Sequence, residues 1–160
     1  MVILLMGVSG VGKTTIGQAL ASELRWSFAD ADDFHSAINV AKMRAGIPLD
    51  DADRAPWLQS LHDAISGWIA NQQSVVLACS ALKEGYRQQL VTGPDVQLVF
   101  LHADFGLIAQ RMAGRYGHHM NPRLLRSQFA TLEAPQDAIS VDAGQPIAEI
   151  VAGIRAALGV

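Results

Sequence analysis

The sequence predicts an α/β fold in which a parallel β-sheet is flanked by helices. Short runs of β-branched and large apolar residues, typical of buried strands, alternate with segments whose apolar residues recur at helical spacing. Strands that alternate with helices favour a parallel sheet, because each crossover helix returns the chain to the same edge. The length of 160 residues, 50% of them hydrophobic, suits one packed core, and no shift in composition marks a linker. We therefore expect a single domain over residues 1–160.

Five segments are expected to form the strands. They are Val2–Met6, Trp26–Ala29, Val75–Cys79, Val96–Leu101 and, with a weaker pattern, Ala138–Val141. The first of these runs is not preceded by positive charge, and the glycines and Lys13 that follow keep it far shorter than a bilayer span. We expect it to be a strand, neither a signal peptide nor a membrane anchor.

Helices are expected between and after these strands. Asp104 is placed to cap one of them, and Asn121-Pro122 is a typical start of another, because Asn accepts hydrogen bonds from free amides and Pro suits the first turn. The apolar stripes that predict the helices are Ile16, Leu20 and Leu24; Trp57, Leu58, Leu61, Ile65, Trp68 and Ile69; Leu107, Ile108 and Met112; Leu124, Leu125, Phe129 and Leu132; and Ile147, Ile150, Val151, Ile154 and Leu158.

The charge and cysteine content exclude several classes of function. Twelve Lys and Arg against 15 Asp and Glu give a net charge of −3, so no broad basic field is available for a nucleic-acid backbone. The single cysteine, Cys79, cannot form an internal disulfide and lies in an apolar run, where we expect a buried thiol. We expect no nucleic-acid or membrane partner, and a reducing, cytoplasmic location.

Residues 7–14, GVSGVGKT, match the phosphate-loop pattern G-x-x-x-x-G-K-[ST] directly after the first expected strand and before the first expected helix. Glycines permit a tight turn whose amides converge on phosphate oxygens. Lys13 supplies a catalytic cation, and the hydroxyl of Thr14 can bind Mg²⁺. A dinucleotide-binding G-x-G-x-x-G cannot be written here, because Thr15 stands three positions after Gly12. The residues expected to bind the nucleotide are Gly7, Ser9, Gly10, Val11, Gly12, Lys13, Thr14 and Thr15.

A phosphate loop is compatible with regulatory GTPases, motors and small-molecule kinases. The chain contains neither D-x-x-G nor N-K-x-D, so the usual means of sensing the γ-phosphate and reading guanine are missing. Asp104-Phe105-Gly106 spells the magnesium triplet of protein kinases, but no H-R-D loop accompanies it, and we interpret it as the start of a helix.

An acidic cluster, Asp30-Ala31-Asp32-Asp33, follows the second expected strand. Three carboxylates in four residues repel one another, which suits a site for magnesium and a hydroxyl group better than a solvated turn. We expect Asp32 to orient and deprotonate the attacking hydroxyl and Asp30 to hold the metal through water. The third strand ends in Cys79-Ser80 without a carboxylate, which leaves the metal to Asp30 and Thr14. His35 is either a substrate ligand or a cap or surface group.

These residues, with blocks further along, resemble the bacterial and eukaryotic gluconokinase family over nearly the whole chain. The resemblance implies ATP-dependent phosphorylation of D-gluconate to 6-phosphogluconate, on a P-loop fold like that of shikimate and nucleoside monophosphate kinases, with a helical lid near residues 111–128 and usually as a homodimer. Two departures are Ala31, where the family commonly has Gly, and residues 119–121 in the lid. The further matching blocks are Asn39, Lys42-Met43, residues 46–58, residues 79–83, Tyr86-Arg87, Gly117-His118, Ser127-Gln128-Phe129, Leu132-Glu133 and Pro135.

A sugar acid needs a cation for its carboxylate. Arg54 could supply a bidentate fork or could merely pair with Asp51 or Asp53. Lys83 and Arg87, four apart on one expected helix, could reach the substrate or form a solvated face, and the resemblance favours a substrate role for both.

Arg111 and Arg115 lie four apart in the expected lid, where such a kinase would stack one arginine on adenine and use another to neutralise transferring charge. We assign both to nucleotide binding and Arg115 also to catalysis. His119 is placed among the substrate-binding residues; with His118 it lacks a third nearby ligand, so a zinc site is not expected. Residues 141–146 either contact adenine, as in the family, or form a plain turn.

Two rival functions remain at this point. The first is phosphorylation of shikimate or another small acid, and the second is a nucleotide-dependent binding module or switch without catalysis.

Overall fold

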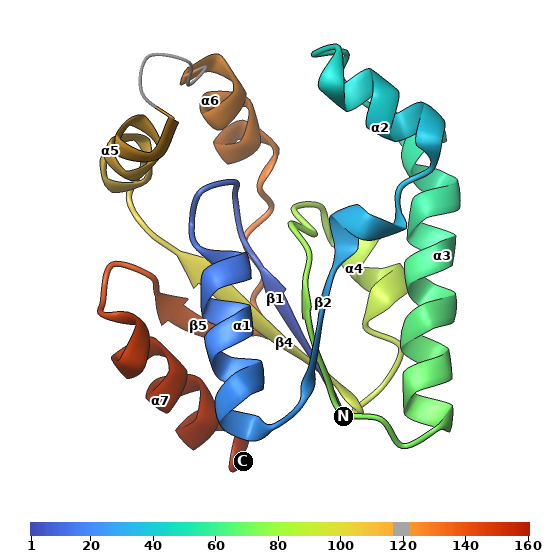
Figure 1. The fold of residues 1–160 in the computed structure, drawn as a ribbon, viewed down its shortest axis with the longest axis vertical. Helices are drawn as coiled ribbons and strands as arrows, with labels where there is room; N and C mark the ends of the chain where they lie inside the picture. Colours follow the sequence, from blue (N-terminus) through green and yellow to red (C-terminus); the bar gives the residue numbers. More distant parts are fainter. Residues whose placement is uncertain (117–121) are drawn as a thin grey trace.

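The computed structural model describes residues 1–116 and 122–160, and in this part of the chain five strands form one sheet in the order β2-β3-β1-β4-β5 (Figure 1). The strands are β1 (Val2–Met6), β2 (Ser27–Asp30), β3 (Val75–Ala78), β4 (Val96–His102) and β5 (Ile139–Asp142). Every neighbouring pair is parallel, and Val2 of the central strand is aligned with Val75 on one side and Val96 on the other. The predicted α/β fold with a five-stranded parallel sheet is confirmed, and each strand boundary lies within one residue of its expected place.

Helices cover both faces of the sheet (Figure 1). Helices α1 (Lys13–Leu24) and α7 (Ile147–Leu158) pack on one face, and α3 (Asp51–Ala70) and α4 (Glu84–Leu90) pack on the other. Side chains of β1 alternate between the two cores, with Ile3 and Leu5 in the first and Val2, Leu4 and Met6 in the second. Because both faces are covered, all of β1 is buried, which explains its unbroken apolar sequence.

Three further helices stand beyond the carboxyl edge of the sheet, where all the strands end (Figure 1). They are α2 (Ala37–Arg44) on one side and α5 (Phe105–Tyr116) and α6 (Pro122–Thr131) on the other. Helix α5 begins directly after Asp104 and α6 begins at Pro122, as expected, although Asn121 lies outside the described residues. Within the described ranges, no helix is both long enough and apolar enough to cross a membrane.

Helix α2 is an element that the sequence analysis did not predict. It is short, and Ile38 and Met43 are exposed, so its apolar residues form no stripe toward the core. The signal that could have found it is Ser36, whose hydroxyl accepts a hydrogen bond from the Asn39 amide at 3.2 Å and caps the helix. A short 3-10 turn, η1 (Ala31–Phe34), connects β2 to this region.

Candidate active site

The loop between β1 and α1 has the backbone that its glycines allow. Gly10 has φ +80°, and a Cβ there would lie 2.6 Å from Cγ of Met112. Gly7 has φ +155°, and a Cβ would lie 2.6 Å from the carbonyl oxygen of Leu101. A side chain at either position would therefore both strain the loop and collide with β4 or α5.

Lys13 lies at the first turn of α1 and folds back over this loop. Its Nζ donates hydrogen bonds to the carbonyl oxygens of Gly7, at 2.9 Å, and Val8, at 3.0 Å. Partial burial lowers the pKa of Lys13, while Cys79, Asp32 and Asp30 act in the opposite direction. A cation held this way lies where the phosphates of a nucleotide would bind.

The two residues expected to hold a metal lie side by side. The hydroxyl of Thr14 donates a hydrogen bond to Oδ2 of Asp30 at 3.2 Å, at the end of β2. The other oxygen of Asp30 accepts from the backbone amide of Asp32 at 3.0 Å, which fixes the carboxylate. Mg²⁺ favours such a sparse set of oxygens, because it keeps several waters and shares phosphate oxygens. Thr14 and Asp30 thus fit the predicted metal role.

Asp32 faces the same space from the turn that follows. Crowding by protein atoms raises the pKa of its carboxyl group, and the negative charge of Asp30 raises it further, against weaker opposing effects of His35 and Lys13. A carboxylate with a raised pKa binds a proton more readily, which suits a general base.

We expect this perturbation to be measurable without substrate or metal. In a carbon-detected NMR titration of the metal-free protein, Asp32 should titrate above the ordinary aspartate pKa of 3.8. Asp30→Asn should lower the pKa of Asp32, because it removes the negative charge that raises this pKa most. Asp33→Asn is the matched control and should shift this pKa less, since Asp33 is the weakest of the contributors. An ordinary pKa for Asp32, unaffected by Asp30→Asn, would contradict the geometry.

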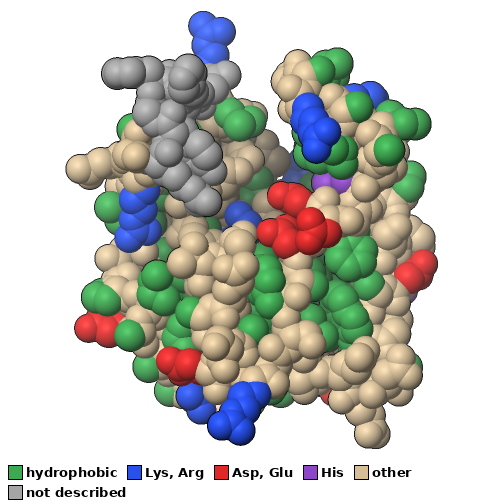
Figure 2. All heavy atoms as spheres, viewed as in Figure 1, with side chains coloured by type: hydrophobic (Ala, Val, Ile, Leu, Met, Phe, Trp, Pro, Cys, Tyr) green, Lys and Arg blue, Asp and Glu red, His purple; other side chains and the backbone are tan. Residues whose placement is uncertain are grey.

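A cleft of about 910 Å³ extends from the phosphate loop between α2 and α6. Figure 2 shows this hollow at the upper end of the molecule, with acidic and basic side chains around it. Asp32, His35 and Arg54 line the cleft, as expected of substrate-binding residues. Arg54 is also 3.8 Å from the exposed carboxylate of Asp51, so the alternative of a surface pair is present in the same structure.

The structure argues against the predicted substrate role of Arg87. Its side chain is 4% exposed, and the guanidinium donates to the carbonyl oxygens of Ala81 at 2.9 Å, Leu82 at 3.1 Å and Glu133 at 2.7 Å. It binds chain segments together behind the cleft wall and is not among the residues that line the cleft. The physical reason for the error is that the guanidinium of Arg87 turns inward to these carbonyl oxygens, whereas Lys83, the N-cap of α4, keeps its side chain 39% exposed.

Of the other basic residues predicted to bind substrate or nucleotide, Lys83 is described by the structure, and Arg115 and His119 are not described in full. Lys83 lies beside the cleft, with Nζ 3.7 Å from the Asp51 carboxylate and 5.6 Å from the centre of the Tyr86 ring. The side chain of Arg115 and the whole of His119 lie outside the described residues, so their roles stay predictions.

Three residues in the site were missed or underrated by the sequence analysis. The hydroxyl of Tyr86 donates to Oδ1 of Asp51 at 2.8 Å and accepts from Nη1 of Arg54 at 3.4 Å, which places the phenol in the cleft wall. Trp57, which the sequence analysis gives no role beyond the apolar stripe of its helix, also lines the cleft. Gln128 of α6 accepts a hydrogen bond from the Ser9 amide at 2.6 Å. The only sequence signal for Tyr86 and Gln128 is that both fall in blocks that carry the family resemblance.

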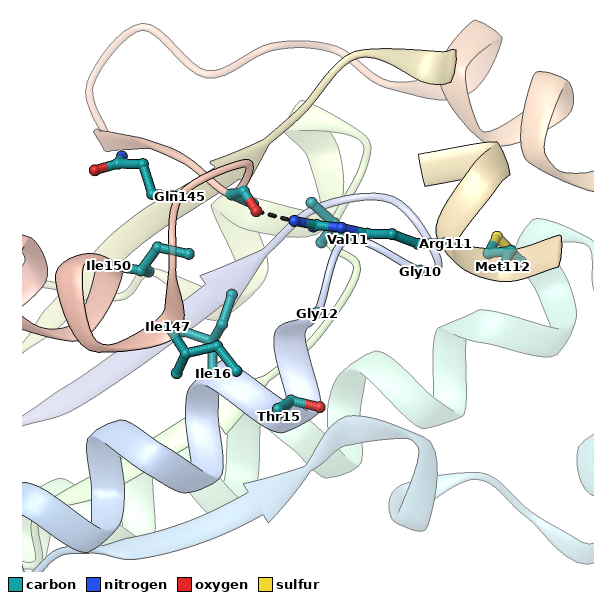
Figure 3. Close-up of a pocket in the computed structure, with 11 residues that line it drawn as sticks. Gly10, Val11, Gly12, Thr15, Ile16, Arg111, Met112, Gln145, Ile147 and Ile150 are labelled. Atoms are coloured by element: carbon teal, nitrogen blue, oxygen red, sulfur yellow. Dashed lines mark hydrogen bonds between the residues drawn. The ribbon is translucent and has the colours of Figure 1, made fainter. Parts of the chain in front are cut away.

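A second pocket, of about 320 Å³, adjoins the phosphate loop on its other side (Figure 3). It lies between the start of α1, helix α5 and the turn that precedes α7. Nη1 of Arg111 donates to the carbonyl oxygen of Ala143 at 2.9 Å, and both residues line the pocket (Figure 3). Its apolar lining, which includes Ile16, Met112 and Ile150, is suited to a planar base.

A phosphate loop with its lysine, a carboxylate beside the loop threonine and a cleft for a second small molecule define a P-loop kinase that acts on small molecules.

A family model described as shikimate kinase matches residues 9–155. Two related sequences and one solved structure, each of a gluconokinase, are similar to this chain over most of its length. The probable gluconokinase of mouse (Mus musculus) is 44% identical over 98% of this chain and 97% of its own length. The thermosensitive gluconokinase of Escherichia coli K12 is 43% identical over 97% of this chain and 86% of its own. The crystal structure of a gluconokinase from Sinorhizobium meliloti 1021 has a TM-score of 0.87 and 41% identity, and covers 98% of this chain and 90% of that one.

The chain therefore belongs to the shikimate kinase family in the broad sense of that model and, within it, to the gluconokinases. It is a kinase, and the family resemblance in its sequence is confirmed.

Proposed function

We propose that this protein transfers the γ-phosphoryl group of ATP to the 6-hydroxyl of D-gluconate and forms 6-phospho-D-gluconate. The observation that carries the proposal is the continuous cleft that joins the phosphate loop to Asp32, His35 and Arg54 in a chain of the gluconokinase family. Gluconate fits it chemically, because the molecule has a carboxylate for a cation at one end and a primary hydroxyl for a base at the other.

The proposed nucleotide site combines the phosphate loop with the smaller pocket of Figure 3. The adenine base would lie in that pocket beside Arg111 and the turn at Ala143, and the phosphates would meet the loop amides and Lys13. Thr14 and Asp30 would hold Mg²⁺, directly or through water, and the ion supplies charge neutralisation for the phosphate oxygens when bound.

Catalysis then depends on position and charge. The oxygen of the 6-hydroxyl forms a bond to the γ-phosphorus, and Asp32 accepts the proton of that hydroxyl. At the same time the bond from the γ-phosphorus to the leaving ADP oxygen breaks. Lys13 stabilises the charge that develops on the transferred group. The sequence assigns a similar task to Arg115, on the proposed lid of residues 111–128.

Arg54 is proposed as the carboxylate clamp, with Lys83 beside it. Arg54→Ala should raise the gluconate KM about ten- to a hundredfold and leave the ATP KM unchanged, because a bidentate charged contact is worth roughly 1.5–3 kcal/mol. Steady-state kinetics with each substrate varied would measure this. Asp51→Asn is the matched control, because it removes the surface partner of Arg54 and keeps the cation.

If Arg54 served only its pair with Asp51, both variants would leave both KM values alone. Each would then change stability by about 0–1 kcal/mol, as is usual for exposed pairs. An unchanged gluconate KM in Arg54→Ala therefore rejects the clamp.

The proposed function is tested by a phosphoryl-acceptor screen. Release of ADP would be followed with MgATP and gluconate, shikimate, related sugar acids and nucleoside monophosphates. We expect rapid release with gluconate. A preference for shikimate would favour the first rival, and no acceptor-dependent release at all would favour a binding module.

Three further statements are proposals of the same kind. We infer that the chain is a single domain, acts in the cytoplasm and forms a homodimer. The free, buried Cys79 is consistent with a reducing compartment, and the dimer rests on the family resemblance. Light scattering coupled to size-exclusion chromatography would measure the oligomeric state.

A further inference from the structure

Asn39 and Arg87 are the two buried polar or charged residues in the part of the chain that the structure describes. The guanidinium of Arg87 is satisfied by three carbonyl oxygens behind the cleft. Asn39 is 5% exposed and lies where α2 meets α3, directly behind the cleft residue His35. A buried amide in a helix that is otherwise largely exposed calls for a physical reason.

The orientation of the Asn39 amide is fixed by chemistry. Its Nδ2 is 2.8 Å from the carbonyl oxygen of Asp53, which can only accept a hydrogen bond, so the NH₂ group must face that oxygen. The same nitrogen is 3.4 Å from Nδ1 of His35. An amide nitrogen has protons to give and no lone pair to offer, so Nδ1 of His35 must be the acceptor. The ring proton of neutral His35 is then on Nε2.

Two other contacts hold the imidazole. It stacks on the indole of Trp57, with ring centres 4.4 Å apart and planes 11° apart. Nε1 of Trp57 donates to the carbonyl oxygen of Ala31 at 2.7 Å, which fixes the indole. One face and one edge of His35 are thus held by residues of α3 and α2, and the ring lines the cleft.

Burial, more than the nearby charges, favours the neutral form of His35. Partial burial lowers its pKa, the negative charge of Asp32 acts against this, and the positive charge of Arg54 lowers the pKa again. Asp53, whose carbonyl oxygen Asn39 contacts, forms a salt bridge with Lys42 at 2.8 Å, so these two charges offset each other.

We propose that Asn39 is a positioning residue that holds His35 as the Nε2–H tautomer, so that the imidazole donates one hydrogen bond to a hydroxyl oxygen of the sugar acid in the cleft. The inference rests on the proposed function, because that function supplies the acceptor. With Nδ1 committed to Asn39, Nε2 is the ring nitrogen left for a ligand. A neutral donor also leaves the substrate carboxylate to Arg54, whereas an imidazolium would compete for it.

The first test needs no substrate. In ¹⁵N-histidine NMR of the unliganded protein at pH 7.5, His35 should show an unprotonated Nδ1 and a protonated Nε2. Its signals are assigned by their loss in His35→Gln. An imidazolium, or a proton on Nδ1, would overturn the inference.

The second test is Asn39→Asp, whose carboxylate cannot donate to Nδ1 and instead accepts a hydrogen bond from a protonated Nδ1. The tautomer should reverse in the NMR spectrum, and the gluconate KM should rise about tenfold with the ATP KM unchanged. Lys42→Ala is the matched control, because it removes the neighbouring contact between α2 and α3 and leaves His35 alone. It should keep the wild-type tautomer and gluconate KM.

Equal effects of Asn39→Asp and Lys42→Ala on the gluconate KM, with the tautomer unaltered, would reduce Asn39 to a structural residue and overturn the proposal. If Asn39→Asp fails to fold, the wild-type NMR spectrum still decides. Failure of the proposed function would appear differently, as a wild-type protein that does not turn over gluconate although His35 carries its proton on Nε2.

Discussion

Replacing Lys13 with alanine is expected to abolish phosphoryl transfer and leave the fold intact. The cation lies over the phosphate loop, within 3.0 Å of two of its carbonyl oxygens, and is the group best placed to stabilise charge on the transferred phosphoryl group. Loss of one such preorganised contact typically lowers kcat by about 10²–10³-fold.

The fold should survive this change because partial burial already disfavours the charge of Lys13, as its lowered pKa shows. Lys13→Met keeps most of the apolar stem and should behave in the same way as Lys13→Ala. Circular dichroism and a melting curve would check the fold, and initial rates with MgATP and gluconate would check transfer. Turnover within tenfold of wild type would refute the assignment of Lys13.

Asp32→Asn and Asp30→Asn are expected to give two different defects. Asp32→Asn should retain MgATP binding and lose turnover by about 10²–10⁴-fold, the usual contribution of a general base. Asp30→Asn should instead shift the magnesium dependence to higher concentration, because Asp30 contacts the Thr14 hydroxyl and Asp32 does not. Magnesium titrations of the rate, with calorimetry for nucleotide binding, would separate the two. Identical titrations for both variants would show that the roles are wrongly divided.

Asp32→Asn also has a predictable effect on stability. The pKa of Asp32 is higher in the folded protein than its ordinary value, so folding favours the protonated form, and this stabilisation is lost as the pH rises through the folded pKa. At neutral pH the ionised carboxylate therefore costs stability. A neutral asparagine should keep or raise the Tm at pH 7, and Asp33→Asn in the same turn serves as the control. A clear fall in Tm for Asp32→Asn alone would contradict the raised pKa.

The sheet and the phosphate site could be predicted from the sequence because each depends on local signals. The strands are buried on both faces and read as unbroken apolar runs, as β1 does. The parallel arrangement brings Asp30, at the end of β2, to the edge where the loop threonine lies, so the meeting of Asp30 and Thr14 follows from topology.

The sequence analysis assigned a wrong role to Arg87 and did not predict the roles of Gln128 and Asn39 or the presence of α2. Most of these features depend on contacts between distant segments of the chain. Arg87 is buried, and its guanidinium donates to the carbonyl oxygen of Glu133, 46 residues further along the chain. The spacing of residues along one helix does not predict such a contact. Gln128 reaches Ser9 across 119 residues. Helix α2 was missed because Ile38, at 71% exposure, contributes nothing to a core-facing stripe. Asn39, which joins α2 to α3, stands out in the sequence only through the family resemblance, and nothing in its local pattern predicts its burial.

The measurement that tests the central claim most directly is identification of the product by ³¹P NMR after incubation of the purified protein with MgATP and gluconate. The proposal predicts ADP and one phosphomonoester in equal amounts, with the phosphorus signal split into a triplet by the two protons on C6 of gluconate. The absence of a phosphomonoester, a phosphate on another hydroxyl, or ADP formed equally well without gluconate would contradict it.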